Sequence, residues 1–358
     1  MLRTEFGYVG RLAPSPTGAL HLGNVRTFMV AWLRARQTGG KVILRMEDLD
    51  HPKHKPGAEA QAIEDLRWLG FDWDEAFTQS ERKGLYAEAL ARLRAQGLAY
   101  PCVCSRRDVE AAQSAPHEGE QLRYPGTCRG RFATWAAAVA FMNSATGETP
   151  VSPVSETGSV PMSATGSVPM SVTGSVPMSA TGSVPVSAPG RIPCWRFRTH
   201  EGARVAFEDV FAGHYEMDVG ATLGDFPLAR DVDGAGYALA VTVDDAAMGV
   251  TEVVRGDDLL PATPPQILLY QALGLQVPAF FHVPLVVGPD GRRLAKRHGD
   301  TRIASFREAG VSPERLIGFL ARSLGLIENE RPIGLRSLIG LLDPARIPRG
   351  PLVYQGLT

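Results

Sequence analysis

The turn between the first expected strand and the first expected helix carries residues that could bind a phosphate group. It reads APSPTG over 13–18, and HLGN over 21–24 then opens the helix. A helix N-terminus presents unbonded backbone N–H groups and the positive end of the helix dipole, and both favour an anion. His21 can donate to a phosphate oxygen, Gly23 permits close backbone approach, and Asn24 can cap the helix or donate. The alternative is a proline-rich turn followed by a surface histidine.

Two common nucleotide-binding patterns are missing at this turn. Neither G-x-G-x-x-G nor G-x-x-x-x-G-K-(S/T) is present there. The sequence therefore excludes a dinucleotide-type turn and a P-loop at this junction.

A second group of residues could bind a metal ion. The sequence holds Cys102-Val-Cys104 and a third thiol, Cys128. Two thiolates close in sequence and a third after a loop suit a tetrahedral structural zinc. The fourth ligand is not obvious, although His117 is possible on spacing, and ordinary reduced cysteines remain the alternative. Cys194 lies in an expected strand and is expected to be part of the core.

Length and composition limit the class of protein. The chain has 358 residues, which predicts two or more packed units, and 44% hydrophobic with 21% charged residues is typical of a soluble globular protein. The net charge of -1 excludes a basic nucleic-acid-coating protein but not a local basic face. No apolar run is long enough to span a membrane, the first residues lack the apolar core expected of a signal peptide, and four cysteines make no disulfide framework. We expect a cytoplasmic protein.

A repeated octapeptide interrupts the chain. The pattern S-x-T-G-S-V-P-(M/V) occurs four times between Ser155 and Val186, and a degenerate fifth copy follows. Each copy contains a proline and a glycine, which excludes a helix, and only valine and methionine are available for a core. We expect a flexible surface insertion, with a ligand-binding array as the alternative.

The rest of the chain alternates between strand-like and helix-like patterns. Strands are expected at 6–14, 41–50, 194–199, 203–209, 237–245 and 252–260. Helices are expected at 25–36, 58–69, 84–96, 265–273, 311–326 and 335–342. This alternation predicts an α/β fold with a largely parallel sheet and ligands at the carboxyl ends of its strands.

Four ordered blocks resemble the motifs of the class I aminoacyl-tRNA synthetases, in the form of the glutamyl group. RLAPSPTGALHLGN (Arg11–Asn24) resembles the HIGH motif, and LRMEDLD (Leu44–Asp50) resembles the strand with the amino-acid-binding glutamate. YALAVTVDDAAMGVTEVVRGDDLL (Tyr237–Leu260) resembles a third block of the family, and RLAKRHGD (Arg293–Asp300) resembles the KMSKS loop. The resemblance covers nearly the whole chain outside the repeats. It implies a Rossmann-like class I synthetase catalytic domain with a small zinc-binding insertion and a C-terminal helical stem-contact segment.

The resemblance implies ATP-dependent activation of glutamate, a reaction that depends on positioning and on electrostatic stabilisation of the phosphates. His21 and Lys296 are the expected catalytic residues, and Mg²⁺ is expected to enter with ATP. The expected ATP-binding residues are His21, Gly23, Asn24, Arg293 and Lys296. The chain departs from the family where Asn24 replaces the second histidine of HIGH, Arg293 replaces the first lysine of KMSKS and Ala295 replaces its serine. These changes could slow activation without removing it.

Glutamate has two carboxylates and one ammonium group, so its pocket needs two cationic donors and one acid. Arg11 and Arg255 can pair with the carboxylates, Glu47 can bind the ammonium, and Tyr237 adds a hydroxyl. The positions that the resemblance assigns to glutamate are Arg11, Leu12, Ala13, Pro14, Ser15, Glu47, Tyr237 and Arg255. The alternative is salt bridging at strand ends.

The cysteine pattern and the C-terminal region indicate one branch of the family. Glutamyl-queuosine tRNA(Asp) synthetases resemble this chain in C-x-C followed by Y-x-x-x-C, with the tyrosine phenolate as a zinc ligand. That resemblance implies one structural Zn²⁺ per chain on Cys102, Cys104, Tyr124 and Cys128. The sequence after Arg297 suffices for stem-contact helices but not for an anticodon-binding region. The branch attaches glutamate to queuosine in the anticodon loop of tRNA(Asp).

The expected domain organisation follows from these assignments. The expected segments are 1–98 and 191–275 for the two halves of the catalytic domain, 99–135 for the zinc-binding insertion, 136–154 for a connecting helix, 155–190 for the repeats and 276–358 for the KMSKS-like loop with the stem-contact segment. We expect a monomer that acts on ATP, L-glutamate and queuosine-containing tRNA(Asp), without a membrane. The alternatives are a truncated glutamyl-tRNA synthetase charging tRNA(Glu), a non-catalytic RNA-binding paralogue and a small-molecule nucleotidyltransferase.

Overall fold

A three-stranded parallel sheet forms the N-terminal part of the computed structural model, which describes residues 7–49, 54–112, 122–146, 192–230, 234–292, 294 and 300–357. Its strands are β1 (Val9–Leu12), β2 (Lys41–Met46) and β3 (Glu75–Thr78), paired in that order. Helix α1 (Leu22–Gln37) connects β1 to β2, and α2 (Ala58–Trp68) lies between β2 and β3 in the sequence. Strands β1 and β2 are short and largely buried, as expected inside a parallel sheet, whereas β3 at the edge is more exposed.

A second sheet adjoins the first. Its order is β7 (Gly213–Asp218), β6 (Arg204–Asp209), β10 (Ala279–Val283) and β9 (Glu252–Gly256), with β6, β10 and β9 parallel and β7 antiparallel to β6. The N–H of Thr251 donates to the carbonyl of Val9 at 2.9 Å, so β1 lies beside the start of β9. The carboxyl ends of β1, β2 and β9 therefore meet in one region.

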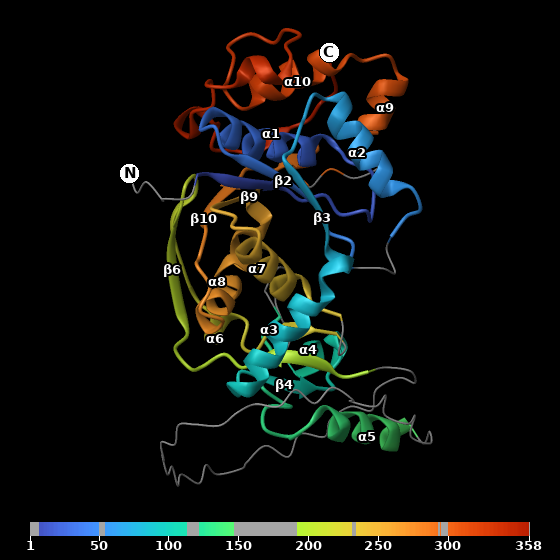
Figure 1. Cartoon of the computed structure of the whole chain (residues 1–358), viewed down its shortest axis with the longest axis vertical. Helices are drawn as coiled ribbons and strands as arrows, with labels where there is room; N and C mark the ends of the chain where they lie inside the picture. Colours follow the sequence, from blue (N-terminus) through green and yellow to red (C-terminus); the bar gives the residue numbers. More distant parts are fainter. Residues whose placement is uncertain are drawn as a thin grey trace.

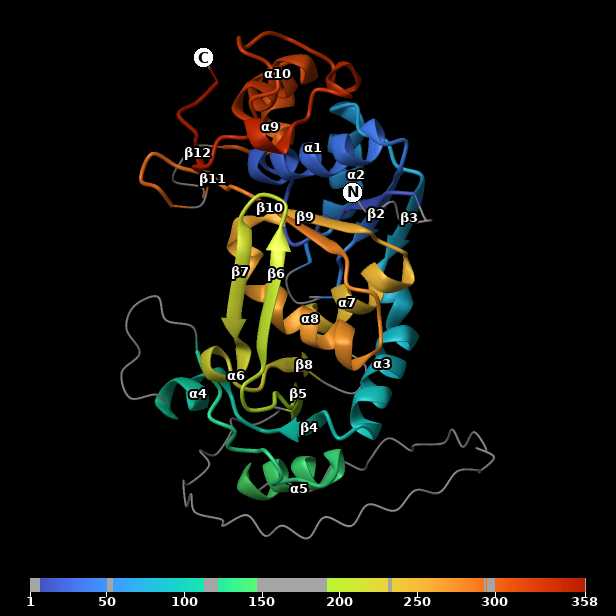
Figure 2. The same ribbon diagram turned by 90° about the vertical axis from the view of Figure 1, so that its left-hand side faces the viewer.

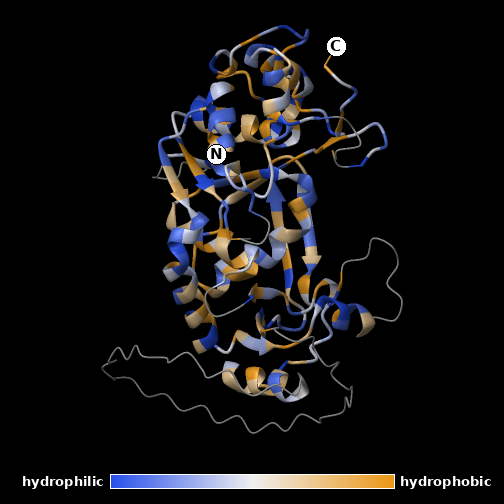
Figure 3. Ribbon diagram, turned by 90° about the vertical axis from the view of Figure 1, so that its right-hand side faces the viewer, coloured by the Kyte–Doolittle hydropathy of each residue, from blue (hydrophilic) through white to orange (hydrophobic). Residues whose placement is uncertain are grey.

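Helices cover these sheets and extend the molecule at both ends. In Figures 1 and 2, α7 (Tyr237–Ala247) and α8 (Thr263–Ala272) lie in the middle, and α3 (Lys83–Ala95) runs toward the lower end. At the upper end, α9 (Ile303–Glu308) and α10 (Pro313–Ser323) lie against α1. The helices carry both hydrophobic and hydrophilic residues, as expected of helices that cover a core (Figure 3).

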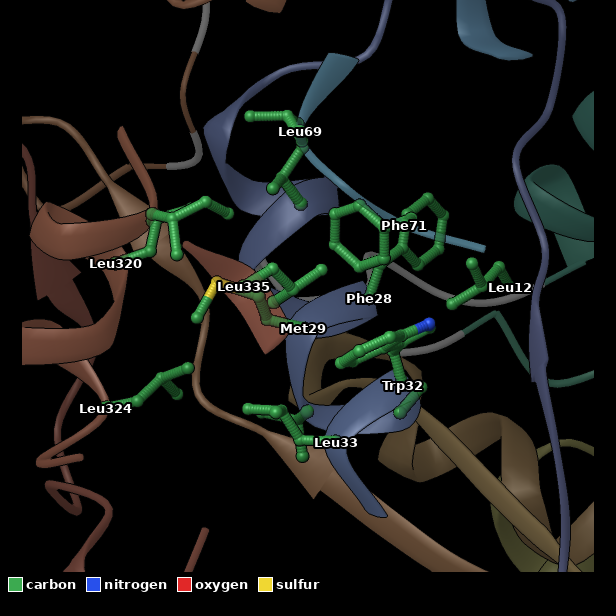
Figure 4. Packing of buried hydrophobic residues seen from close by; sticks show 14 of the residues in the cluster. Leu12, Phe28, Met29, Trp32, Leu33, Leu69, Phe71, Leu320, Leu324 and Leu335 are labelled. Atoms are coloured by element: carbon green, nitrogen blue, oxygen red, sulfur yellow. The ribbon is translucent and has the colours of Figure 1, made fainter. Parts of the chain in front are cut away.

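Helix α1 joins the catalytic sheet to the C-terminal helices. Met29 and Leu33 of α1 are fully buried, and Figure 4 shows Leu320 of α10 and its C-cap residue Leu324 on the side of α1 that carries them. On another side of α1, Trp32 packs edge-on against Phe71, with the ring centroids 6.2 Å apart. One continuous core thus holds the helix whose N-terminus was predicted to bind phosphate.

The lower end of the molecule is a small antiparallel unit. Strands β4 (Ala99–Cys102), β5 (Cys194–Phe197) and β8 (Pro227–Ala229) pair in that order, and α4 (Arg106–Ala112) and α5 (Trp135–Thr146) lie beside them (Figure 2). The remaining elements are α6 (Val219–Thr222), β11 (Val286–Val287), β12 (Leu352–Val353) and 3₁₀ turns at Gln79–Arg82, Asp257–Ala262, Leu335–Leu338 and Pro344–Arg346.

The structure corrects three of the expected elements. The segment 237–245, expected as a strand, is helix α7. This helix is buried on several sides, so its apolar residues do not recur with a helical period. Its valines are typical of a strand, which explains the wrong prediction. The expected strand at 252–260 ends at Gly256, and the expected helix at 335–342 is a single 3₁₀ turn.

The predicted α/β class is confirmed, and every pair in the two central sheets is parallel except β6–β7. The repeats at 155–190, His117, Arg293 and Lys296 lie outside the described residues. The predicted domain limits stay predictions. Across the described ranges, no helix has the length and apolar character needed to cross a membrane.

Candidate active site

The turn before α1 forms the capped helix N-terminus that the sequence predicted. His21 is the N-cap residue, and its Nδ1 accepts a hydrogen bond from the N–H of Gly23 at 3.1 Å. The Asn24 side-chain oxygen accepts from the N–H of His21 at 3.2 Å, which completes a capping box. Because Nδ1 is an acceptor, the proton of the neutral ring is on Nε2, which makes Nε2 a donor.

Gly23 leaves room for the His21 imidazole at the helix N-terminus. A Cβ atom at Gly23 would lie 3.0 Å from Cε1 and 3.1 Å from Nδ1 of His21. A side chain would therefore press against the imidazole, which would have to move by a few tenths of an ångström.

A cavity of about 450 Å³ opens at the carboxyl ends of β1, β2 and β9. The candidate residues that line it are Arg11, Ala13, His21, Gly23, Asn24, Glu47, Tyr237 and Arg255. Phosphate-binding and glutamate-binding candidates thus share one cavity, as a reaction between the two ligands requires. Leu294, the described residue between Arg293 and Ala295, also lines it.

Three of the candidates do not line this cavity. Leu12 is fully buried in the core, and Ser15 is exposed. Pro14 is buried, and its carbonyl accepts the N–H of Glu47 at 2.9 Å, which ties the turn to the end of β2. These residues shape the turn through their backbone.

A buried ion network supports the floor of the cavity. Arg45 is fully buried, and its guanidinium binds Asp245 Oδ1 at 2.6 Å and Glu47 Oε1 at 3.0 Å. Asp245 also lies 3.5 Å from Arg11 Nε. Burial raises the pKa of Glu47, and the guanidinium groups of Arg45 and Arg11 oppose that rise.

Sequence reasoning missed two members of this network, Arg45 and Asp245. An arginine inside the apolar strand KVILRM was the available signal, because a buried charge needs a partner. Asp245 could not be found in this way, because the segment was expected to be a strand. In a strand, Tyr237 and Asp245 would lie roughly 26 Å apart. In α7 they lie on one face, two i+4 steps apart.

The neighbouring Asp244 anchors α7 to the segment before α3. Its carboxylate accepts from Arg82 Nε at 2.7 Å, Gln79 Nε2 at 2.8 Å and the Tyr86 hydroxyl at 2.7 Å. The two adjacent aspartates thus hold α7 from two directions, and Tyr237 at its first turn is placed at the cavity.

A second cluster of candidate residues lies in the antiparallel unit. Cys102, Cys104 and Cys128 are buried, and their sulfur atoms lie within 4.8 Å of one another. The Tyr124 hydroxyl oxygen is 3.3 Å from Cys102 Sγ and 3.7 Å from Cys104 Sγ. Three converging thiols fit a metal ion such as zinc. Cys194 is partly buried and lies opposite Cys102 in the β4–β5 pairing.

A buried arginine supports this cluster. Arg196 donates from Nε to Cys102 Sγ at 3.2 Å and from Nη1 to the carbonyl of Asp225 at 3.0 Å. Its guanidinium carbon lies 3.9 Å from the centroid of the Tyr124 ring. A cation in this position favours anionic forms of the sulfur and oxygen atoms around it.

Comparison with known proteins connects both clusters to one family. Residues 8–140 and 182–334 match the family described as tRNA synthetases class I (E and Q), catalytic domain. A glutamyl-Q tRNA(Asp) synthetase of Symbiobacterium thermophilum is 45% identical over 96% of this chain and 94% of its own length. A glutamate–tRNA ligase of Aquifex aeolicus is 38% identical over 96% of this chain and 63% of its own length. A crystal structure of a glutamate tRNA ligase from Elizabethkingia meningosepticum, in complex with its amino acid, matches with a TM-score of 0.72 at 24% identity, over 98% of this chain and 67% of that one.

Proposed function

Because this chain belongs to the class I tRNA synthetases for glutamate and glutamine, as its four sequence blocks predicted, we propose that it activates L-glutamate with ATP and transfers it to queuosine in tRNA(Asp). The observation that carries this proposal is the similarity of the chain to glutamyl-Q tRNA(Asp) synthetases. Those relatives are 40–45% identical, and the first of them matches along nearly all of both chains. The glutamate–tRNA ligases found beside them are 36–38% identical.

The charge of the cavity suits glutamate. Arg11 and Arg255 line the cavity beside the acids Glu47 and Asp258, and the Arg45–Asp245 pair lies behind them. We assign Arg11 and Arg255 to the two carboxylates of glutamate. Glu47 is assigned to the ammonium, and Tyr237, 45% exposed at the cavity, contributes its hydroxyl.

The ATP phosphates belong at the α1 N-terminus in this proposal. The backbone N–H groups at Gly23 and Asn24 and the Nε2 donor of His21 bind them. The resemblance assigns Arg293 and Lys296 to the same phosphates, and Leu294, their neighbour in the sequence, lines the cavity. Mg²⁺ enters with ATP. These groups oppose the negative charge that builds up on the phosphates as the mixed anhydride with glutamate forms.

We further propose that the thiol cluster holds one structural Zn²⁺, with Tyr124 as the fourth ligand. The proximity of the Tyr124 oxygen to two of the three sulfur atoms supports this assignment. Arg196 supports it as well, because its guanidinium faces both Cys102 and the Tyr124 ring. The metal stabilises the small antiparallel unit and takes no part in the chemistry. A tRNA substrate supports the predicted cytoplasmic location, and the monomeric state stays a prediction.

An acceptor panel tests the proposed function. Purified protein, ATP and labelled glutamate are incubated with three RNAs: tRNA(Asp) containing queuosine, tRNA(Asp) with unmodified guanosine and tRNA(Glu). We expect label on the first RNA alone, and ATP–pyrophosphate exchange with glutamate in the absence of any RNA. Labelled tRNA(Glu), or exchange that requires tRNA(Glu), would instead establish a glutamyl-tRNA synthetase. RNA binding without exchange would establish a non-catalytic paralogue.

A further inference from the structure

A line of polar side chains crosses the second sheet behind the cavity. Asp209 ends β6, His282 lies in β10 and Arg255 lies in β9, so the three residues stand on neighbouring strands. Arg255 is directly opposite His282 in the strand pairing. Arg255 lines the cavity, but His282 is fully buried and does not. No step described so far uses Asp209 or His282.

Asp209 fixes the orientation and the tautomer of His282. Its Oδ2 lies 2.6 Å from His282 Nδ1, and its Oδ1 accepts the backbone N–H groups of Phe211 at 3.0 Å and Ala212 at 2.8 Å. Because an ionised carboxylate only accepts, Nδ1 carries the ring proton and Nε2 is left as an acceptor. Burial lowers the pKa of His282 although Asp209 opposes this, so the ring is neutral.

His282 and Thr263 together hold one edge of the Arg255 guanidinium. Arg255 Nε donates to His282 Nε2 at 3.0 Å, and Arg255 Nη2 donates to Thr263 Oγ1 at 2.7 Å. Thr263 Oγ1 is 3.2 Å from His282 Nε2, so its hydroxyl proton can close the triangle. Within the described ranges these are the only hydrogen bonds or ion pairs of Arg255, and they use two of its five donor hydrogens.

We propose that Asp209, His282 and Thr263 are positioning residues that fix the plane of Arg255 so that its remaining donors face a carboxylate of L-glutamate. This inference rests on the proposed function, in which Arg255 binds the substrate. A planar guanidinium recognises a carboxylate through two parallel bonds, so its orientation determines whether both bonds form. An arginine that is already oriented loses less conformational freedom on binding.

Two amide substitutions at His282 separate positioning from simple support of the fold. His282→Asn keeps an amide near the Nδ1 position that can still donate to Asp209, but it removes the acceptor for Arg255. His282→Gln reaches the Nε2 position, and its oxygen can accept from Arg255. In glutamate-dependent ATP–pyrophosphate exchange, we expect His282→Asn to raise the KM for glutamate about tenfold or more. We expect His282→Gln to recover most of this loss.

The KM for ATP and the kcat at saturating glutamate should change little in both variants, because the interaction concerns glutamate binding alone. Thr263→Val removes the second acceptor with little change of volume, and should raise the KM for glutamate several-fold. His214→Asn is the matched control, since His214 also pairs with a carboxylate, Glu208 at 2.7 Å, but both side chains are exposed. It should leave the KM for glutamate unchanged.

The results distinguish failure of the proposed function from failure of the positioning role. Absence of glutamate-dependent exchange in the unmodified protein overturns the proposed function. Normal exchange in that protein, with an unchanged KM for glutamate in folded His282→Asn and Thr263→Val, overturns only the positioning role. An equal rise of the KM for ATP, or no recovery in His282→Gln, also overturns it. If His282→Asn does not fold, Thr263→Val carries the test, with melting temperatures recorded for every variant.

Discussion

Replacement of Arg45 by methionine removes the cation at the centre of the ion network under the cavity. Arg45 is fully buried and makes charge-assisted hydrogen bonds to Asp245 at 2.6 Å and to Glu47 at 3.0 Å. Methionine fills a similar volume, so the effect comes mainly from the buried Asp245 and the partly buried Glu47, which lose this cation and keep Arg11 nearby. Loss of one member of a buried ion pair costs about 3–5 kcal/mol, and we expect Arg45→Met to lose that amount of unfolding free energy.

Urea denaturation measures this loss through the midpoint, provided that the slope is unchanged. Lys41→Met is the matched control on the same strand, because Lys41 pairs with Glu75 at 3.0 Å while both side chains are exposed. A surface pair of this kind contributes about 0–1 kcal/mol. The KM for glutamate should also rise in Arg45→Met and not in Lys41→Met.

The pH dependence gives an independent check of the same variant. Burial raises the pKa of Glu47, and Arg45 lowers it, so removal of Arg45 raises that pKa further. A carboxyl group with a raised pKa in the folded state favours folding when it is protonated, and this contribution is lost as the pH rises through that pKa. Arg45→Met should therefore recover part of its stability on acidification. A loss below about 1 kcal/mol, or one equal to that of Lys41→Met, would refute the network as described.

Three further predictions concern the other parts of the molecule. Gly23→Ala should reduce ATP–pyrophosphate exchange, though less than His21→Ala, because its Cβ would lie 3.0 Å from the imidazole and push it slightly aside; normal exchange would contradict the capping geometry. A Cys102→Ser/Cys104→Ser double variant should lose the single zinc measured by elemental analysis, together with thermal stability, whereas a native protein without zinc would disprove the metal assignment. Lys296→Ala should slow adenylate formation by about 10²–10³-fold in single-turnover experiments, and an unchanged rate would remove this lysine from the site.

Local patterns in the sequence predicted the parts of the site that depend on local structure. The HLGN turn identified the α1 N-terminus, because a cap is set by residues next to one another. Arg11, Glu47 and Arg255 were expected near the carboxyl ends of parallel strands, which share one edge of a sheet. All three line one cavity at the ends of β1, β2 and β9.

The sequence did not predict the parts that depend on tertiary packing. Helix α7 was expected as a strand, because a helix buried on several sides shows no amphipathic period. That error hid Asp245, and with it the partner of Arg45. The link between Asp209 and His282 spans 73 positions, so no spacing rule could have indicated it.

The most direct test of the central claim locates the glutamate on its acceptor. Queuosine-containing tRNA(Asp) is incubated with the protein, ATP and labelled glutamate, and nuclease digestion then separates the anticodon-loop fragment from the 3′-terminal fragment. We predict that the label is found on the anticodon-loop fragment and disappears when unmodified guanosine replaces queuosine. Label on the 3′-terminal fragment would contradict the account.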